Sequence, residues 1–390
     1  EEMAAGKSLG SALKAAYEKA FSAIFDANIT SLMTALILLW RASDQMKGFA
    51  ITLTIGILAS MFAALLATRV FFFWGNDTGV MKKLTFMNLV PERTIRFLEM
   101  RKPAFMLSGV LFIGSLVLLG TKGNDSLGID FLGGSIISVQ LDADTTLTAA
   151  DARAAYSELT LSKDATAQLE TVPGSDSSIL SIKCAEEDLV PIKEALRSNI
   201  EILGAKEGDA YKVVIQDNTI AASLGGEFLE NSLWALGIGL LAVLFYISLR
   251  FEFSFAVGAF AALFHDIVIT VGIIVLLGTE LSLIHVGAIL TIAGYSINDT
   301  IIIFDRIRES LLTKRGSIKD IMNIAINATL SRTILTSGTT FVTVLVLFIF
   351  GGGAMKDFSL AIMIGVIVGT YSSIFIASPL VYLWSKARGT

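Results

Sequence analysis

The sequence predicts a polytopic α-helical membrane protein with an α+β domain inserted between two of its membrane helices. Three observations support this fold class. First, the 390 residues are 54% hydrophobic and only 17% charged, whereas soluble domains contain about 25% charged residues. Second, apolar stretches close to the roughly 20 residues that a spanning helix needs recur along the chain. Third, one internal segment, 121–230, is strongly acidic, with 19 acidic and 8 basic residues.

Eight apolar stretches are the expected membrane spans, and residues 1–21 before them form an expected amphipathic helix at the membrane surface. Lys and Arg are concentrated in the loop 75–103, after Phe304 and in the C-terminal tail. By the positive-inside rule these parts face the cytoplasm, so the acidic segment faces the periplasm or its equivalent. The spans are expected at 27–42, 49–74, 104–120, 231–249, 255–277, 284–304, 333–351 and 358–384.

The two ends of the chain repeat one another. Shifted by 309 positions without a gap, 8–30 matches 317–339 and 46–62 matches 355–371. Because the match includes the loop, it indicates a duplication rather than chance similarity between apolar helices. Both copies begin on the same side, so the repeat is parallel, with a pseudo-twofold axis along the membrane normal. The second copy has six spans and the first shows two, so we expect the full-length protein to continue upstream of Glu1.

The acidic segment contains an expected ferredoxin-like domain. Strand and helix signals alternate as β-α-β-β-α-β, which is the ferredoxin-like order. This fold is a common platform and specifies no activity by itself. The strands are expected at 135–141, 165–172, 177–184 and 211–216, and the helices at 148–159 and 189–200. The single cysteine, Cys184, cannot form an intrachain disulfide.

The motif GIDFLGG (128–134) leads into this domain and has two interpretations. Gly128, Gly133 and Gly134 permit backbone angles or close approaches that other residues do not. A phosphate-binding loop is one interpretation, but the GxxxxGK[ST] pattern is missing from it. The favoured interpretation is a tight turn in which Asp130 caps or hydrogen-bonds backbone amides.

Asp299, inside the apolar run VGAILTIAGYSINDTIIIF, is the leading functional candidate. A charge in a membrane helix costs roughly 2.5–3.5 kcal/mol on insertion scales, and it usually marks a proton or ion path. Polar residues flank it at helical spacing, and Arg332 belongs to a second polar stripe, so we expect the two helices to face each other. The alternative for each single Thr is a hydrogen bond to its own helix. The two stripes are Thr291, Tyr295, Asn298, Asp299 and Arg306, and Thr329, Arg332, Thr336, Thr339, Thr340 and Thr343.

Other polar residues in the spans are secondary candidates. Successive helical residues diverge by about 100°, so His265 and Asp266 are expected to point apart, with Asp266 inward. A structural hydrogen-bond network is the alternative for Asp266. Asp26 and Asn28 open the first expected span, and their alternative role is N-capping at the membrane face. His285 is expected at the membrane interface.

Four segments together resemble the signature segments of the SecF family. They are GIDFLGG, RFEFSFAVGAFAALFHDIVIT (250–270), GYSINDTIIIFDRIRES (294–310) and NATLSRTILTSGTT (327–340). Residues 1–74, with FSAIFDANIT, resemble the C-terminal end of SecD. The chain as a whole is therefore similar to the second half of a fused SecDF protein-export membrane protein. On this resemblance, 75–103 is a cytoplasmic connector, 104–120 the first SecF-like helix, 121–230 the periplasmic domain, and 231–390 the remaining five helices and cytoplasmic tail.

The resemblance implies a transmembrane repeat of the RND superfamily and a role that is not enzymatic. It implies an accessory subunit of the Sec translocase in the bacterial inner membrane that uses the proton-motive force late in protein export. Protons are the coupling ion, without a metal or other cofactor. Asp299 and Arg332 match the family's proton-conducting pair, with Asp266, Asn298 and Thr336 as further relay candidates. The family's other acidic residue corresponds to position −10, before Glu1. The implied partners are SecYEG, SecA, YajC, YidC, the translocating unfolded polypeptide and membrane lipids, and they include no nucleic acid.

Three other functions remain open at this point. An RND-type exporter of lipids or small molecules shares the fold and relay, but it needs larger outer domains than 121–230. An intramembrane aspartyl protease needs two facing carboxylates, for which Asp266 and Asp299 could be nominated. The chain has GYSIND in place of a GxGD pattern, and Arg332 has no role in that chemistry. A passive translocon scaffold would make Asp299 and Arg332 dispensable.

Overall fold

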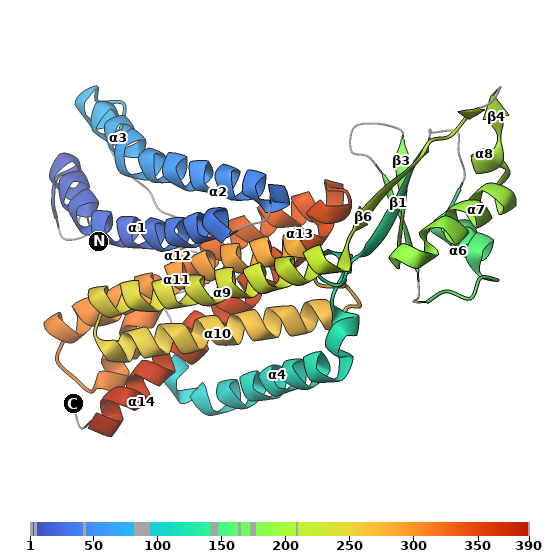
Figure 1. Ribbon diagram of the computed structural model, residues 1–390. Helices are drawn as coiled ribbons and strands as arrows, with labels where there is room; N and C mark the ends of the chain where they lie inside the picture. The colour runs from blue at the N-terminus through green and yellow to red at the C-terminus, as the bar shows by residue number, and fades with distance from the viewer. Residues whose placement is uncertain are drawn as a thin grey trace.

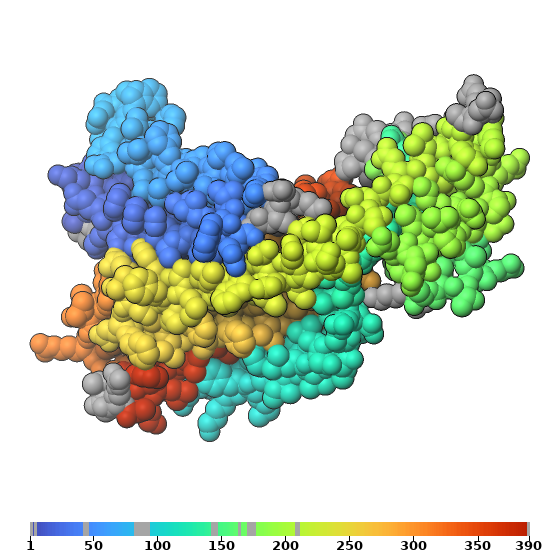
Figure 2. Space-filling model, viewed as in Figure 1, coloured from blue at the N-terminus to red at the C-terminus, as the bar shows by residue number. Residues whose placement is uncertain are grey.

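The computed structural model describes residues 3, 6–41, 44–81, 94–141, 147–162, 165–171, 177–207 and 210–388. In this part of the chain, eight helices are long and apolar enough to cross a membrane. They form one bundle, and a smaller domain projects from one end of it (Figures 1 and 2). The predicted spans are thus confirmed. Much of the expected connector, 82–93, lies outside the described residues.

The bundle helices are longer than the apolar stretches that predicted them. In chain order they are α1 (Leu9–Arg41), α2 (Asp44–Phe62) with α3 (Thr68–Asp77), α4 (Arg101–Lys122), α9 (Ala222–Arg250), α10 (Phe253–Leu276), α11 (Leu283–Thr313), α12 (Ile318–Phe350), and α13 (Gly353–Ser372) with α14 (Ser378–Arg388). A π-helical turn joins α2 to α3 at Ala63–Ala67, and another joins α13 to α14 at Ser373–Ala377.

The first helix corrects two predictions. α1 begins at Leu9, so most of the expected surface helix and the first span are one continuous helix. The segment before the span is rich in Ala and contains no Pro, so nothing interrupts the helix there. Asp26 and Asn28 therefore lie inside α1, and the N-capping interpretation of these two residues is wrong.

The internal repeat extends to the helix boundaries. Shifting α1 by 309 positions gives 318–350, which are the bounds of α12. The same shift carries the π-helical turn at 63–67 to 372–376, within one residue of the turn at Ser373–Ala377. The two copies therefore share both helix length and helix irregularity, as expected for a duplication.

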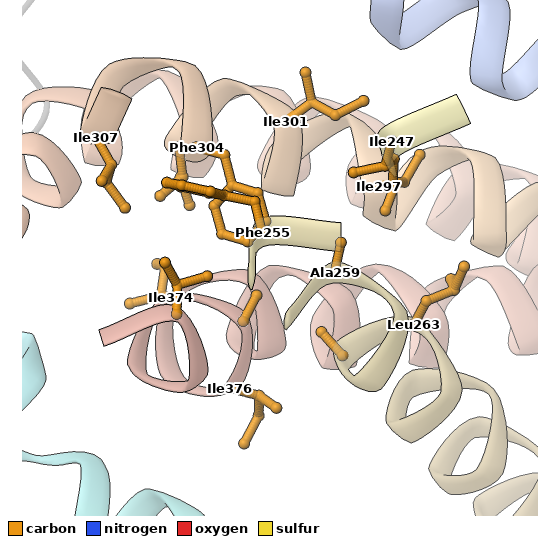
Figure 3. Close-up of a cluster of buried hydrophobic side chains, with 14 of the residues drawn as sticks. Ile247, Phe255, Ala259, Leu263, Ile297, Ile301, Phe304, Ile307, Ile374 and Ile376 are labelled. Carbon is orange, nitrogen blue, oxygen red and sulfur yellow. The ribbon is translucent and has the colours of Figure 1, made fainter. Parts of the chain in front are cut away.

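The largest apolar core lies between α10, α11 and the segment that joins α13 to α14. Phe255 of α10 and Phe304 of α11 meet edge to face, with ring centroids 5.0 Å apart. Figure 3 shows this pair among isoleucines from α9, α11 and the segment that joins α13 to α14. Burial of these side chains fixes the position of α11 along most of its length. The isoleucines labelled around the pair are Ile247, Ile297, Ile301, Ile307, Ile374 and Ile376.

The projecting domain, which we call the sheet domain (residues 134–220), has the predicted ferredoxin-like order. Its four antiparallel strands lie in the order β2-β3-β1-β6, and α6 and α7 pack on one face over Ile137, Leu180 and Ile182. The strands are β1 (Gly134–Leu141), β2 (Thr166–Thr171), β3 (Ser178–Cys184) and β6 (Ile215–Ile220), and the helices are α6 (Ala149–Tyr156) and α7 (Leu189–Asn199).

The last strand is displaced from its predicted position. We expected it at 211–216, whereas β6 occupies Ile215–Ile220. Pairing of β1 with β6 joins Val139 to Ile215 and Gly134 to Ile220, and this register buries Ile215 in the sheet-domain core. The segment before it forms a short hairpin of β4 (Lys206–Glu207) and β5 (Ala210–Tyr211) that the sequence did not predict.

Candidate functional site

Asp299 is buried in the middle of α11 beside hydroxyl groups from two other helices. Its side chain is 2% exposed, and its Oδ2 accepts a hydrogen bond of 3.2 Å from Ser337 Oγ of α12. Thr370 Oγ1 of α13 lies 2.7 Å from the same Ser337 Oγ, and Tyr295 of α11 lies 3.4 Å from it. A buried carboxylate is stable only with such donors, so this cluster connects α11, α12 and α13.

Arg332 lies near Asp299 without a direct ion pair. Among the described residues, the ion pairs do not include Arg332 with Asp299, although its positive charge is close enough to act on the carboxylate. Thr336, one turn further along α12, is partly buried. The structure therefore brings the predicted pair into one region, with Ser337 as the residue that contacts Asp299.

Arg332 lines two pockets in the bundle. One has a volume of about 510 Å³ and lies between α1, α3, α11 and α12. The other has a volume of about 280 Å³ and lies between α1, α2 and α11, where Asn28 and Asn298 are among its polar lining residues. Arg332 therefore lies at the boundary between the two pockets.

We had predicted that the two polar stripes face each other, but the structure shows this for only part of their length. Thr291 and Asn298 of α11 line the smaller pocket, whose other lining residues come mostly from α1 and α2, with Arg332 from α12. On α12, Thr339 donates to Leu335 O and Thr336 O, and Thr343 donates to Thr339 O. For these threonines the alternative interpretation, bonding to the preceding turn, is correct.

Asp266 forms a second buried network. It is 0% exposed and accepts hydrogen bonds from Ser296 Oγ at 2.6 Å and Ser372 Oγ at 2.7 Å. We expected His265 and Asp266 to point apart, but His265 Nδ1 lies 3.0 Å from Asp266 Oδ1, so this prediction is wrong. The His265 ring also stacks with the rings of Phe112 and Tyr371, at centroid distances of 6.4 Å and 6.5 Å.

Asp26 pairs with a residue of α9. Its carboxylate, 6% exposed, lies 2.6 Å from Arg250 Nε and accepts a 2.8 Å hydrogen bond from Tyr246. Ser22 also bonds to Arg250. Asn28 donates to Ile24 O at 2.8 Å and lines the smaller pocket. This ion pair fastens α1 to α9, two helices far apart in sequence.

The lead-in motif is a tight turn with a side-chain cap, as favoured from the sequence. Asp130 Oδ2 accepts a hydrogen bond of 3.0 Å from the backbone amide of Leu283, the first residue of α11. Gly133 has φ +79°, and a Cβ there would lie 2.5 Å from Ala222 Cα. Gly128 donates to Leu281 O, and Gly134 begins β1 with φ +142°. His285 closes the same helix end by contacting Ser282 Oγ at 2.8 Å.

Sequence reasoning missed the hydroxyl and cationic partners of these carboxylates. Ser296 could have been found, because it lies three residues before Asp299 and so shares a helical face with it. Ser337 carries a weaker signal, since it is the repeat counterpart of the candidate Asn28. Ser372, Thr370 and Arg250 reach their partners only through helix packing.

The arrangement can bind and release protons inside the bundle. Asp266 and Asp299 stand on adjacent helices and have separate hydroxyl partners, with Ser296 of α11 bonded to Asp266 and Ser337 of α12 bonded to Asp299. Carboxylates and hydroxyls in such surroundings can exchange protons and break or remake interhelical hydrogen bonds. In the part of the chain that the structure describes, no group of three or more His, Cys, Asp or Glu side chains could hold a metal ion.

Comparison with known proteins identifies relatives along the whole chain. Residues 203–387 match the family described as protein export membrane protein SecD/SecF, C-terminal. The protein translocase subunit SecF of Desulfurispirillum indicum is 42% identical over 295 residues, covering 74% of this chain and 91% of that protein. The protein translocase subunit SecDF of Thermus thermophilus is 34% identical over 398 residues, covering 100% of this chain and 51% of that protein.

A solved structure agrees with this similarity. The crystal structure of SecDF, a translocon-associated membrane protein from Thermus thermophilus, superposes with a TM-score of 0.83 at 30% identity. The match covers 99% of this chain and 51% of that one. The chain therefore spans most of the SecF relative and about half of the SecDF relatives.

Proposed function

This chain belongs to the SecD/SecF family of protein export membrane proteins, and from that premise we propose that it is an accessory subunit of a bacterial Sec translocase that uses the proton-motive force to promote export. The observation that carries the proton-driven part is the Asp299 cluster. A buried carboxylate bonded to Ser337, which itself contacts Thr370, makes the packing of three helices depend on one ionisable group.

The proposed mechanism is a shift between two bundle arrangements. A proton that reaches Asp299 neutralises it, which weakens the charge-assisted hydrogen bond from Ser337 and the attraction to Arg332. The contacts between α11, α12 and α13 then favour a second arrangement. One charge crossing a potential of 100 mV supplies about 2.3 kcal/mol, so a few protons are enough to bias such an equilibrium. Asp266, Asn298 and Thr336 extend the relay in this proposal.

The remaining assignments follow the family. We assign 1–74 to the end of the SecD-like half, 75–103 to the connector, and 104–390 to the SecF-like half with its domain at 121–230. We propose that the protein lies in the inner membrane with the sheet domain in the periplasm. SecYEG, SecA, YajC and YidC are the proposed partners, and the unfolded polypeptide is the cargo.

Two alternatives receive less support. A lipid or small-molecule exporter needs an outer domain that encloses a substrate path, whereas the sheet-domain core is filled by fully buried side chains such as Ile137 and Leu180. An aspartyl protease needs two carboxylates that share a proton. Asp266 and Asp299 instead have separate hydroxyl partners.

The test is Asp299→Asn in the full-length protein. We expect loss of proton flux in inverted membrane vesicles together with reduced secretion of an exported reporter protein. The matched control is Glu230→Gln, which removes an exposed carboxylate of α9 outside the relay and leaves both readouts unchanged. Flux and secretion that survive Asp299→Asn would rule out the relay and leave the passive scaffold. Loss of small-molecule export with intact protein secretion would favour the exporter.

A further inference from the structure

Residues 126–134, which connect α4 to β1, are bonded to the loop between α10 and α11. The amide of Leu281 donates to Ser126 O, and the amide of Gly128 donates to Leu281 O, each at 2.8 Å. Leu127 and Leu281 thereby form a parallel β-bridge. The path into the sheet domain is thus held against the loop that begins α11.

Asp130 extends this attachment to α11 itself. The first amides of a helix have no partner within that helix, and Asp130 supplies one to Leu283 from a different segment. A carboxylate at a helix N-terminus is also favoured by the helix dipole. Phe131 and Leu283, 5% and 6% exposed, pack in the same apolar cluster. The contact is therefore both polar and apolar.

The segment 126–134 also packs against α9, so closely that no side chain fits between the two backbones. A Cβ on Gly225 would lie 2.8 Å from both Gly133 N and Phe131 O. Together with the 2.5 Å approach of Gly133 to Ala222, this leaves α9 and the lead-in turn in direct backbone contact. Close-packed backbones have little freedom to slide past one another.

We propose that residues 126–134 are a coupling clamp that transmits motion of α11 to the sheet domain, with Asp130 as its positioning residue. Asp299 lies on the same uninterrupted helix as Leu283, about 24 Å away at 1.5 Å per residue. A rigid helix carries a displacement at Asp299 to its capped end. The clamp passes it to β1, which is the strand bonded to both β3 and β6.

This inference rests on the proposed function, because it names how the relay would act on the sheet domain. It differs from a flexible connection in one respect. If the sheet domain moved independently of α11, the clamp would open during the cycle. In our proposal the clamp stays closed and moves as a unit with α11.

The first experiment locks the clamp in the full-length protein. In a Cys184→Ala background, Leu127→Cys and Leu281→Cys place two thiols across the β-bridge, where the backbone spacing suits a disulfide. We expect proton flux and reporter secretion to be the same in the oxidised and reduced protein. Secretion that is lost on oxidation and restored by a reductant would show that the clamp must open, and would overturn the proposal.

The second experiment weakens the clamp. Asp130→Ala removes the cap, whereas Asp130→Asn keeps an acceptor that can cap a helix. We expect Asp130→Ala to retain proton flux while secretion per proton falls by about fivefold or more, and Asp130→Asn to restore most of it. Retained flux also reports that the bundle is folded. An unchanged ratio in Asp130→Ala, or a parallel loss of flux and secretion, would refute a coupling role.

Asp299→Asn distinguishes a failure of the relay from a failure of the clamp. If that variant keeps its flux, the relay itself is wrong. If it loses flux but the two clamp experiments fail, only the clamp is wrong.

Discussion

The rings of Phe49 and Phe358 meet edge to face, with centroids 5.2 Å apart, although the two residues occupy the same position in the two copies of the repeat. Equivalent residues can touch only where the pseudo-twofold axis passes between them. The larger pocket lies on the same axis, because Ala20 and Ala23 line it together with their counterparts Thr329 and Arg332. Arg332 is a cation that only one copy supplies at this position of the axial pocket, since its counterpart is Ala23.

The Phe49–Phe358 contact should stabilise the association of the two copies. We expect each single Ala substitution to lower the free energy of unfolding, and the double variant to lose less than the sum by about 1 kcal/mol. Denaturant titration in detergent measures all four proteins. Phe49→Ala combined with Phe245→Ala, at a lipid-exposed position of α9, is the control. It should be additive, and additivity of the Phe49–Phe358 pair would contradict the prediction.

Removing only Asp26 from its ion pair with Arg250 should lower the stability more than replacing both residues. Asp26→Leu copies the residue found at the equivalent position 335, but it leaves Arg250 without its carboxylate partner. We expect a loss of roughly 2–4 kcal/mol. Adding Arg250→Leu should recover at least half of it, since no uncompensated charge then remains. Thermal unfolding in detergent tests both, and a double variant no more stable than Asp26→Leu would exclude this account.

Gly133 and Gly278 have nearly the same backbone angle in different surroundings. Their φ values are +79° and +81°, but a Cβ at Gly278 meets nothing within 4 Å, whereas one at Gly133 meets Ala222. We expect Gly278→Ala to cost about 1 kcal/mol for conformation alone. Gly133→Ala should cost at least twice as much, because the backbone of α9 must move. Equal losses of stability in the two variants would mean that close packing at Gly133 is unimportant.

Cys184 should make the sheet domain sensitive to alkaline pH. Burial raises the pKa of the Cys184 thiol to about 11, above its value of about 8.5 in an unfolded chain. Because the folded-state value is the higher one, the contribution to stability is complete below about pH 8.5 and is lost as pH rises towards 11. We expect wild type to lose about 1–3 kcal/mol more than Cys184→Ala over this range. The near-ultraviolet circular dichroism of denaturant titrations at several pH values measures the difference, and parallel profiles would disprove it.

The extent of prediction from sequence differs between elements for physical reasons. The eight spans follow from the length of apolar stretches alone, and the sheet order follows from alternation and spacing. The start of α1 was missed because the apolar stretch that predicted the span begins only after Asp26. The helix itself extends further towards the N-terminus, since Asp26 and Asn28 have hydrogen-bond partners within the bundle. The last strand was misplaced because its register depends on pairing with β1, which is far away in sequence.

The candidate site shows the same division. Asp299 and Asp266 can be found from the sequence directly, because each is a carboxylate inside an apolar helix. Their partners Ser337, Ser296 and Ser372 are ordinary hydroxyl residues, and a hydroxyl in a membrane helix bonds equally well to its own preceding turn, as Thr339 does. Only the packing of α11 against its neighbours decides which hydroxyls turn inward. The same holds for the partnership of Asp26 with Arg250 on α9.

The two π-helical turns indicate which features of the fold are older than the duplication. Such turns are rare, and they interrupt a helix at one place. Their occurrence one residue from exact repeat register means that the ancestral unit already contained the turn before it was duplicated. Arg332 opposite Ala23, and Asp26 opposite Leu335, are differences between the copies and therefore arose later. The irregular helix is common to the two copies, whereas the charges at these two positions differ between them.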